Sequence, residues 1–150
     1  HWSIPKGMID YSEKPYEAAL RELKEETNLE IVWEEEKFKH PLSPLSPVKY
    51  NKSSKTLIPY IVKLGEFYKT KGELKCTSMV QHINGKPCTP FPEQDKFAWV
   101  TFDDAVERLH EDQSRCIMSN WMYLEQTMTE AREAEHNKRR KEINEYQRNI

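Results

Sequence analysis

Absent features restrict what this 150-residue chain can be before any motif is considered. Cysteine is scarce: Cys76, Cys88 and Cys116 form no Cys-x-x-Cys pair, and their odd number excludes a disulfide framework and a cysteine-based zinc site. Free thiols fit a reducing, intracellular compartment, with the cytoplasm and the mitochondrion both left open. No apolar run approaches the roughly 18 residues of a membrane span, so we expect no membrane-embedded protein.

Positive charge is not in excess either, because the formal net charge is −2 at pH 7. That balance excludes a nucleic-acid binder that relies on its overall charge, so a polyanionic ligand would need a local basic patch or a metal ion. The chain does have 37% hydrophobic residues, enough for a modest core, and 32% charged residues, which is above average. We therefore expect one small domain with solvated elements attached.

Periodicity and turn-forming residues predict alternating strands and helices. The predicted elements are strands at 1–7, 29–33, 56–64 and 97–100, helices at 15–27, 102–109 and from 112 onward, and a weak hairpin within 69–92. Pro15 suits the first turn of a helix, and Asn28 suits the left-handed residue that ends one. Pro59 is unusual inside a predicted buried strand, because proline cannot donate a hydrogen bond to a neighbouring strand.

The chain changes character near residue 129. An apolar stripe at helical spacing ends there, and its members are Ile117, Trp121, Leu124 and Met128. We therefore predict a body over residues 1–128 and a charged helical extension over residues 129–150, either a solvated helix or a frayed tail. Its basic run 138–141 could contact RNA or an acidic partner, but neighbouring glutamates favour a solvated helix.

The predicted helix 15–27 gathers its acidic residues on one side. At about 100° per residue, Glu25 and Glu26 lie about 60° and about 40° to either side of Glu22. The apolar Leu20 and Leu23 lie on a different face, which can pack on a sheet. Three carboxylates this close repel one another unless a cation neutralises them, and a hard divalent ion such as Mg²⁺ is suited to carboxylate oxygens. The three glutamates by themselves could equally be a solvated acidic face. The flanking residues therefore decide between that interpretation and a metal site.

Those flanking residues form a recognisable pattern. Gly7, Glu13 and the run Arg21 to Leu29 meet eight of the nine fixed positions of G-x5-E-x7-R-E-U-x-E-E-x-G-U, where U is a bulky aliphatic residue. This pattern is the Nudix box, and the chain resembles that family. The one departure is Asn28 in place of the last glycine, a mild change because Asn tolerates the same left-handed conformation.

The resemblance implies a fold, a metal and a set of roles. The fold would be a Nudix α/β/α sandwich around a mixed sheet, here with a long charged C-terminal helix added. Mg²⁺, with Mn²⁺ as an alternative, would be bound by Glu22, Glu25 and Glu26 with help from the Gly7 carbonyl. Glu13 would be a supporting catalytic carboxylate, and Arg21 would be structural. The metal would polarise phosphate oxygens and generate the attacking nucleophile.

Further runs resemble one branch of the family, the asymmetrical diadenosine tetraphosphate hydrolases. They are the opening H-W-S-I-P-K-G at 1–7, K-T-L-I at 55–58 and W-V-T-F-D-D-A at 99–105. The resemblance implies phosphate contacts for Lys6 and Lys55, a place along the phosphate path for His1, and adenine stacking for Phe97. It makes Glu93 an extra metal ligand or a candidate general base, alongside Glu13, Glu22 and Glu26.

Plainer interpretations stand beside these roles. Lys6 and Lys55 could be ordinary surface lysines, and Phe97 could be a core residue. Glu93 lies in a proline-rich loop, where either interpretation holds. Tyr60 follows Pro59 one place later than the branch's aromatic residue. A one-residue shift in a strand predicts that its ring faces away from a nucleobase, unless Pro59 sits in a bulge.

Three functions remain open at this stage. The first is hydrolysis of a pyrophosphate bond in a dinucleoside polyphosphate, similar to a bis(5′-nucleosyl)-tetraphosphatase. The second is the same chemistry at the 5′ end of RNA, and the third is an interaction or RNA-binding subunit of a larger complex. Because almost nothing precedes the strand at His1, we expect either missing first strands or a protein partner that completes the sheet or binds the C-terminal helix.

Overall fold

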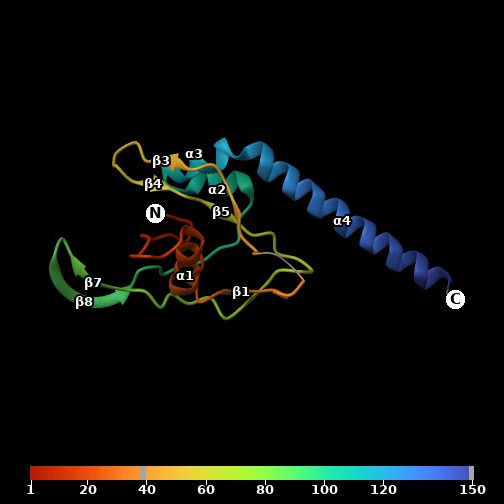
Figure 1. The fold of residues 1–150 in the computed structure, drawn as a ribbon, viewed down its shortest axis with the longest axis horizontal. Coiled ribbons are helices and arrows are strands. Elements are labelled where there is room, and N and C mark those ends of the chain that lie inside the picture. The colour runs from red at the N-terminus through yellow and green to blue at the C-terminus, as the bar shows by residue number, and fades with distance from the viewer. Residues whose placement is uncertain (38–39, 149–150) are drawn as a thin grey trace.

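The computed structural model describes residues 1–37 and 40–148 and shows a mixed α/β fold (Figure 1). In this part of the chain the helices are α1 (Pro15–Thr27), α2 (Phe102–Arg108), α3 (Glu111–Ser119) and α4 (Trp121–Arg148). The strands are β1 (Glu30–Val32), β2 (Ser43–Pro44), β3 (Val48–Lys49), β4 (Thr56–Leu57), β5 (Tyr60–Ile61), β6 (Lys69–Lys71), β7 (Met79–Ile83) and β8 (Lys86–Pro92). The predicted α/β class is confirmed, as is the long C-terminal helix.

Helix α1 has the boundaries that the sequence predicts. Pro15 occupies the first turn, and the backbone N–H of Lys14 donates a 2.9 Å hydrogen bond to Glu17, which fixes the start of the helix. Asn28 adopts the left-handed conformation, with φ 61° and ψ 11°, and its N–H bonds the Lys24 carbonyl at 2.8 Å. The replacement of glycine in the box therefore leaves the end of the helix intact.

The strands are short and pair in antiparallel twos, β1 with β6, β2 with β5, β3 with β4, and β7 with β8. A parallel bridge joins Trp2 to Leu109, and it is all that the structure shows of the strand predicted at 1–7. The sheet pairing in the described residues is thus more fragmented than a single mixed sheet. The paired strands and the loops between them surround α1, which lies centrally in Figure 1.

Besides the strand at 1–7, two more predicted strands are wrong. The stretch 56–64 is broken after Leu57 into β4 and β5, because the buried Pro59 has no N–H to extend the pairing, although its carbonyl accepts from Leu45 at 3.0 Å. The stretch 97–100 has strand-forming residues, yet the structure assigns no strand there and Trp99 is 76% exposed. β-propensity describes fit to a sheet, and here no neighbouring strand pairs with the segment.

The core is small, as the composition predicts. The buried apolar residues are Ala18, Leu29, Ile31, Cys76 and Cys116. The apolar side of α1 faces a cavity of about 340 Å³ that β4 and β5 close on the other side, and the acidic side of α1 is left to form the candidate site.

The C-terminal helices end in a projecting arm. Thr101 caps α2 by accepting from the N–H of Asp104 at 3.2 Å, and Asn120 separates α3 from α4. Helix α4 extends away from the body, on the opposite side from the β7–β8 hairpin, and none of its residues is buried (Figure 1). Of the two alternatives predicted for 129–150, the structure shows an exposed helix over residues 129–148, and the last two residues of the predicted extension lie outside the described part. No helix in the described ranges is both long and apolar enough to cross a membrane.

Candidate functional site

Three glutamates share one side of α1 but differ in burial. Glu26 is 1% exposed, whereas the side chains of Glu22 and Glu25 are 13% and 45% exposed. A carboxylate buried as deeply as Glu26 is costly unless it has hydrogen-bond partners or can take up a proton. The partners of these glutamates therefore determine what this face can do.

Glu26 is held between two segments that are distant in the sequence. Its Oε2 accepts a hydrogen bond from the backbone N–H of Lys6 at 3.0 Å, and its Oε1 accepts one from the side-chain amide of Gln94 at 3.5 Å. Burial raises the pKa of Glu26, the hydrogen bond from Lys6 opposes that rise, and the nearby negative charge of Glu93 adds to it. A carboxylate with a raised pKa is a stronger proton acceptor, which is the property that a general base needs.

Arg21 uses all five of its N–H groups on its surroundings. Its Nε and Nη2 donate to Glu13 at 2.8 and 3.0 Å, and Nη2 also donates to the Met8 carbonyl at 2.8 Å. Its Nη1 donates to Glu22 at 2.7 Å and to Glu25 at 3.3 Å. The hydrogen bonds with Arg21 lower the pKa of Glu13, and those with Glu13 and Glu22 raise the pKa of Arg21. One permanent cation therefore ties the loop before α1 to two glutamates of the acidic face.

Gly7 lies directly against the acidic face. A Cβ atom at this position would collide with the carboxylate of Glu22. Glycine therefore permits a close approach between the segment that precedes α1 and the glutamate one turn before Glu26. The Gly7 carbonyl, predicted to assist in metal binding, belongs to this closely packed segment.

A cavity of about 480 Å³ brings together three of the predicted site residues, His1, Lys6 and Glu93. Gln94, which donates a hydrogen bond to Glu26, also lines it, whereas Glu26 itself lines a separate cavity of about 290 Å³. The size falls within the range of about 300–1,000 Å³ typical of ligand sites. Two basic groups and an acidic one thus share a cavity that adjoins the buried glutamate.

The other two predicted substrate-binding residues lie elsewhere. Lys55 is exposed just before β4 and lines none of the three cavities described here, while Phe97 lines a separate cavity of about 290 Å³ that it shares with Glu26. Pro59 and Tyr60 both line the 340 Å³ cavity beside Glu22. The strand is interrupted at Pro59, so strict alternation of side chains does not apply there, and the orientation of Tyr60 toward a nucleobase stays a prediction.

Several residues at the site were missed by the sequence analysis. Tyr50, Lys52 and His110 line the 480 Å³ cavity, and the rings of Tyr50 and His110 stack with centroids 6.3 Å apart. Ser78 donates a 2.7 Å hydrogen bond from its hydroxyl to Glu93, which fixes that carboxylate at the base of the β7–β8 hairpin. Lys52 could have been noticed because it lies three residues before Lys55. The others carry no signal in the sequence, because the fold alone brings them to the site.

The donors at this site are carboxylate oxygens, together with the Gly7 carbonyl. Within residues 1–37 and 40–148, no three His, Cys, Asp or Glu side chains converge closely enough to enclose a metal ion by themselves. Mg²⁺ does not need such an enclosure, since it is usually held by one or two carboxylates with water and substrate phosphates. Glu26 and Glu93, which are close enough to influence each other's charge, suit that mode of binding. An all-oxygen donor set suits Mg²⁺ or Mn²⁺ and not a thiolate-seeking metal.

A family of known proteins matches most of the chain. The sequence model of a protein family described as NUDIX domain matches residues 1–121, which is most of the chain and stops at the first residue of α4. The long arm beyond Trp121 thus lies outside the matched region.

A curated relative matches over a shorter stretch. An RNA pyrophosphohydrolase of Azorhizobium caulinodans is 61% identical over 31 residues, which is 21% of this chain and 18% of that protein. The aligned stretch thus spans less than a fifth of the relative's length. No solved structure is similar enough to count as a match.

Proposed function

The chain belongs to the Nudix family, and from that premise we propose that it hydrolyses a phosphoanhydride bond of a nucleoside polyphosphate, with dinucleoside polyphosphates as its substrates. One observation carries the assignment of the site. The buried Glu26, whose pKa is raised by burial, is held by Lys6 and Gln94, and both of these residues line the cavity that contains Glu93. An acid next to basic groups in a cavity of ligand size is what phosphate hydrolysis requires.

The chain's own residues have distinct tasks in this proposal. Lys6 and Lys52 bind the polyphosphate as point charges, and His1 lines its path. A water oxygen forms a bond to phosphorus, the bridging P–O bond breaks, and a proton of that water passes to a carboxylate. Glu26, whose pKa is raised, and Glu93 are the candidate acceptors, and the proton passes to the one that does not ligate the metal ion.

A divalent metal ion would neutralise phosphate charge and activate the attacking water when bound. Glu22, Glu25 and Glu26 would hold it, with Glu93 and the Gly7 carbonyl in support. Arg21 would orient Glu22 and Glu25 through its hydrogen bonds without touching the substrate. Glu13 would not contact the metal ion itself. It would hold Arg21 in place by accepting two hydrogen bonds from it.

The nucleobase has aromatic rings available within the same cavity. The stacked Tyr50 and His110 lie with Lys52 and His1, whereas the predicted Phe97 lines another cavity. Stacking requires only the face of a ring, so the pair could hold a base beside the basic groups. This arrangement favours a nucleotide over inorganic polyphosphate as the substrate.

Turnover with Mg²⁺ tests the proposal. Diadenosine tetraphosphate should be split asymmetrically into ATP and AMP, and Glu26→Gln should lower kcat by about 10²–10⁴-fold while leaving the fold intact. Glu133→Gln is the matched control, because Glu133 is an exposed glutamate of α4. Equal rates in the wild type and in the Glu26 variant would refute the assigned role.

A second candidate substrate is RNA with a 5′ triphosphate. The observation in its favour is the similarity of part of the chain to an RNA pyrophosphohydrolase. Release of pyrophosphate from such an RNA, with no cleavage of diadenosine tetraphosphate, would support RNA 5′-end hydrolysis and argue against dinucleoside polyphosphates as the substrates.

The third function considered, a non-catalytic interaction subunit, predicts no turnover of any pyrophosphate by a folded protein. The full set of box glutamates argues against it, since a scaffold has no physical need for a crowded acidic face.

A further inference from the structure

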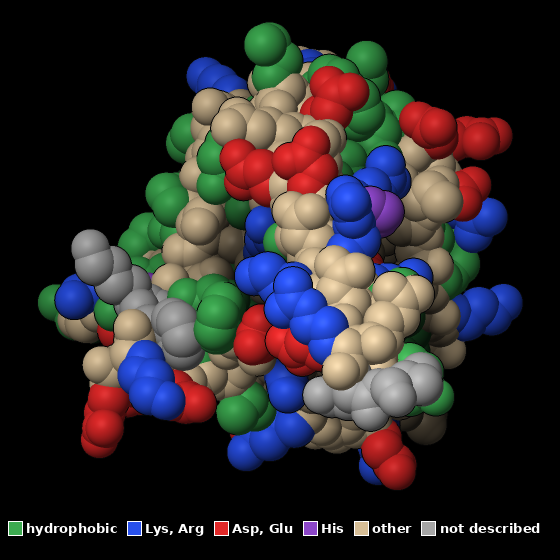
Figure 2. Space-filling view, turned by 90° about the vertical axis from the view of Figure 1, so that its right-hand side faces the viewer, with side chains coloured by type: hydrophobic (Ala, Val, Ile, Leu, Met, Phe, Trp, Pro, Cys, Tyr) green, Lys and Arg blue, Asp and Glu red, His purple; other side chains and the backbone are tan. Residues whose placement is uncertain are grey.

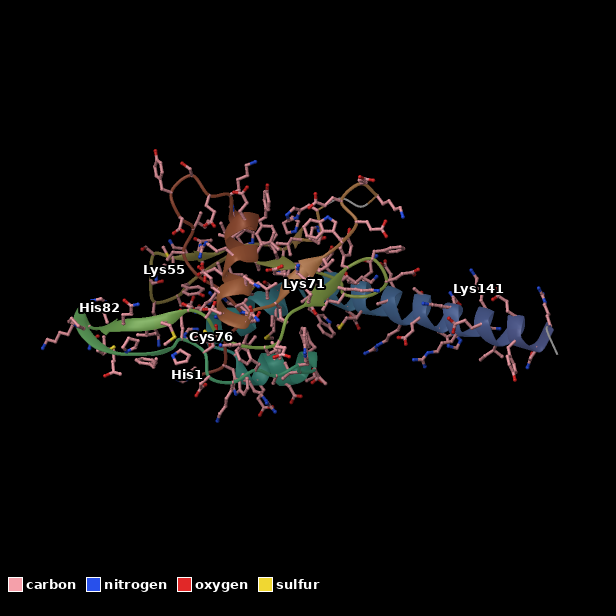
Figure 3. All side chains as sticks on the ribbon, turned by 90° about the horizontal axis from the view of Figure 1, so that it is seen from below. His1, Lys55, Lys71, Cys76, His82 and Lys141 are labelled. Carbon is pink, nitrogen blue, oxygen red and sulfur yellow. The ribbon has the colours of Figure 1, made fainter. Side chains whose placement is uncertain are left out.

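Helix α4 beyond residue 128 is a second charged region that the proposed hydrolysis does not use. From Thr129 to Arg148 it is about 30 Å long at 1.5 Å per residue, and none of its residues is buried. It projects from the body, and Lys141 lies far from His1 and Lys55 in Figure 3. Figure 2, which looks at the molecule from the side on which α4 ends, shows Lys and Arg side chains gathered in the middle of this view.

The charges of this segment are segregated around the helix. At about 100° per residue, a sector about 120° wide contains Arg132, His136, Arg139 and Arg140 and no acidic residue. We call these four residues the arginine face. The remaining two-thirds of the circumference carries five glutamates against three cations, and its charged residues are Glu130, Glu133, Glu135, Lys138, Lys141, Glu142, Glu145 and Arg148. The helix is therefore cationic on one side and weakly acidic on the other, although its whole charge is close to neutral.

The arginine face is largely free to bind a ligand. Arg139 pairs with Glu135 at 2.6 Å, but both side chains are more than 60% exposed, so that pair is weak. Arg132 and Arg140 make no ion pair with any described residue. Two exposed apolar side chains, Ile143 and Tyr146, lie within or at the edge of the same sector. Two arginines without an ion-pair partner among the described residues and a third in an exposed pair, placed along one line, match a ligand with a repeated negative charge.

We propose that the arginine face binds the phosphate backbone of single-stranded RNA. Four basic groups along about 12 Å of helix face a row of phosphates, and arginine is the side chain best suited to phosphate oxygens. Tyr146 offers a ring on which an unpaired base can stack, which favours a single strand over a duplex. The inference goes beyond the proposed hydrolysis, because the surface would hold RNA whether or not the catalytic site acts on its 5′ end.

Other polyanions fit this face less well. An anionic membrane would call for a broad apolar face beside the cations, and here the sector contains one large aliphatic residue, Ile143. An acidic protein presents carboxylates, which arginine also binds in a bidentate way, but it offers no unpaired base for the exposed ring of Tyr146. Binding to an anionic membrane is an alternative outcome of the test.

The test measures direct binding with no turnover. Fluorescence anisotropy would follow a labelled oligouridylate of about 15 nucleotides, longer than the face at about 3.4 Å per stacked nucleotide, with the 150-residue chain in EDTA. The variant R132Q/R139Q/R140Q removes three cations of the arginine face. Its matched control, K138Q/K141Q/R148Q, removes three cations from the other side of the same helix and leaves an equal net charge.

The expected result is specific to the face. The wild-type affinity should fall with salt, and the arginine-face variant should bind at least about tenfold more weakly with a salt slope shallower by about 2, since each single-strand phosphate contact contributes about 0.7. The control variant should keep the slope to within about 0.7. Circular dichroism should show the same helix content in all three proteins. Equal losses in the two variants, or binding to phosphatidylserine vesicles but not to RNA, would overturn the proposal, and neither result bears on whether the chain hydrolyses nucleotides.

Discussion

Arg21 and Arg139 make the same kind of ion pair in two very different regions of the molecule. Each pairs with a glutamate one helical turn away, at 3.3 Å for Arg21 with Glu25 and at 2.6 Å for Arg139 with Glu135. Arg21 is 26% exposed and also bonds Glu13, Glu22 and a backbone carbonyl, whereas Arg139 is 71% exposed and has a single partner. A charge near α1 is therefore fixed in one geometry, and a charge on α4 is free to find an external ligand.

The difference follows from burial and not from residue type. Around α1 the loop 8–13, the segment 1–7 and the loop after β8 all contact the acidic face, so each charge is surrounded by partners. None of the last 20 residues of helix α4 is buried, so water screens its charges. Catalysis needs the first arrangement, because reacting groups must be held in place. Recognition of a flexible polyanion is better served by the second.

The largest expected effect is on kcat, and it separates the buried Glu26 of α1 from the exposed Glu133 of α4. Glu26→Gln should lower kcat by about 10²–10⁴-fold, because it removes the carboxylate that accepts a proton or binds the metal. Glu133→Gln on α4 should leave kcat unchanged. Steady-state turnover with saturating Mg²⁺ measures both, and a similar kcat for the two variants would erase the distinction between the regions.

The second comparison concerns the two arginines themselves. Arg21→Ala should cost about 2–3 kcal/mol of unfolding free energy, because three carboxylates lose their common cation. Its kcat should fall by about tenfold or more as Glu22 and Glu25 lose their orientation. Arg139→Ala should cost less than about 0.5 kcal/mol, as expected for an exposed pair. Urea denaturation gives these values, and equal costs would show that Arg21 does not organise the site.

A third and smaller effect should follow from a methyl group placed against the acidic face. Gly7→Ala introduces a Cβ that collides with the carboxylate of Glu22, and we expect a loss of about 1–3 kcal/mol and a several-fold lower kcat. Gly65→Ala is the control, since a Cβ there meets no atom within 4 Å. Thermal unfolding followed by circular dichroism should separate the two. An unchanged Gly7→Ala protein would mean that the close packing of Gly7 on Glu22 is not needed.

The smallest expected effect is on the pH dependence of the unfolding free energy, to which Glu26 and Glu13 contribute in opposite directions. The pKa of Glu26 is raised above the ordinary value of 4.5, so the folded state binds its proton more tightly than the unfolded chain does. The resulting stability is present below pH 4.5 and is lost as the pH rises through the raised pKa. Glu13 has a lowered pKa, so its contribution is present above 4.5 and is lost as the pH falls through the lowered value.

Denaturation at a series of pH values would separate these two contributions. Glu26→Gln should remove the loss of stability that the wild type shows as the pH rises above 4.5. Glu13→Gln should remove the loss of stability that it shows as the pH falls below 4.5. Identical pH profiles for the wild type and both variants would contradict the assigned environments.

Local features of the fold could be predicted from the sequence, and contacts between distant segments could not. The boundaries of α1 follow from Pro15 and Asn28, and the cap of α2 follows from Thr101, because these signals act within a few residues. The strand predicted at 97–100 is wrong, because a strand exists only where another strand pairs with it.

The same limit applies to the candidate site. The box motif indicated the acidic face and Arg21, which lie on one helix. Gln94 and His110 reach the site from positions 68 and 84 residues beyond Glu26, and no periodicity in the sequence connects such positions. The separation of Phe97 from the cavity of His1 and Lys6 is likewise a property of the tertiary fold.

The measurement that tests the central claim most directly is a crystal structure with Mn²⁺ and a non-hydrolysable diadenosine tetraphosphate analogue. Anomalous scattering locates the metal without reference to the protein. We expect the ion among the carboxylates of Glu22, Glu25 and Glu26, with the polyphosphate extending toward Lys6 and His1. A bound nucleotide whose metal lies elsewhere, with those carboxylates facing solvent, would contradict the account.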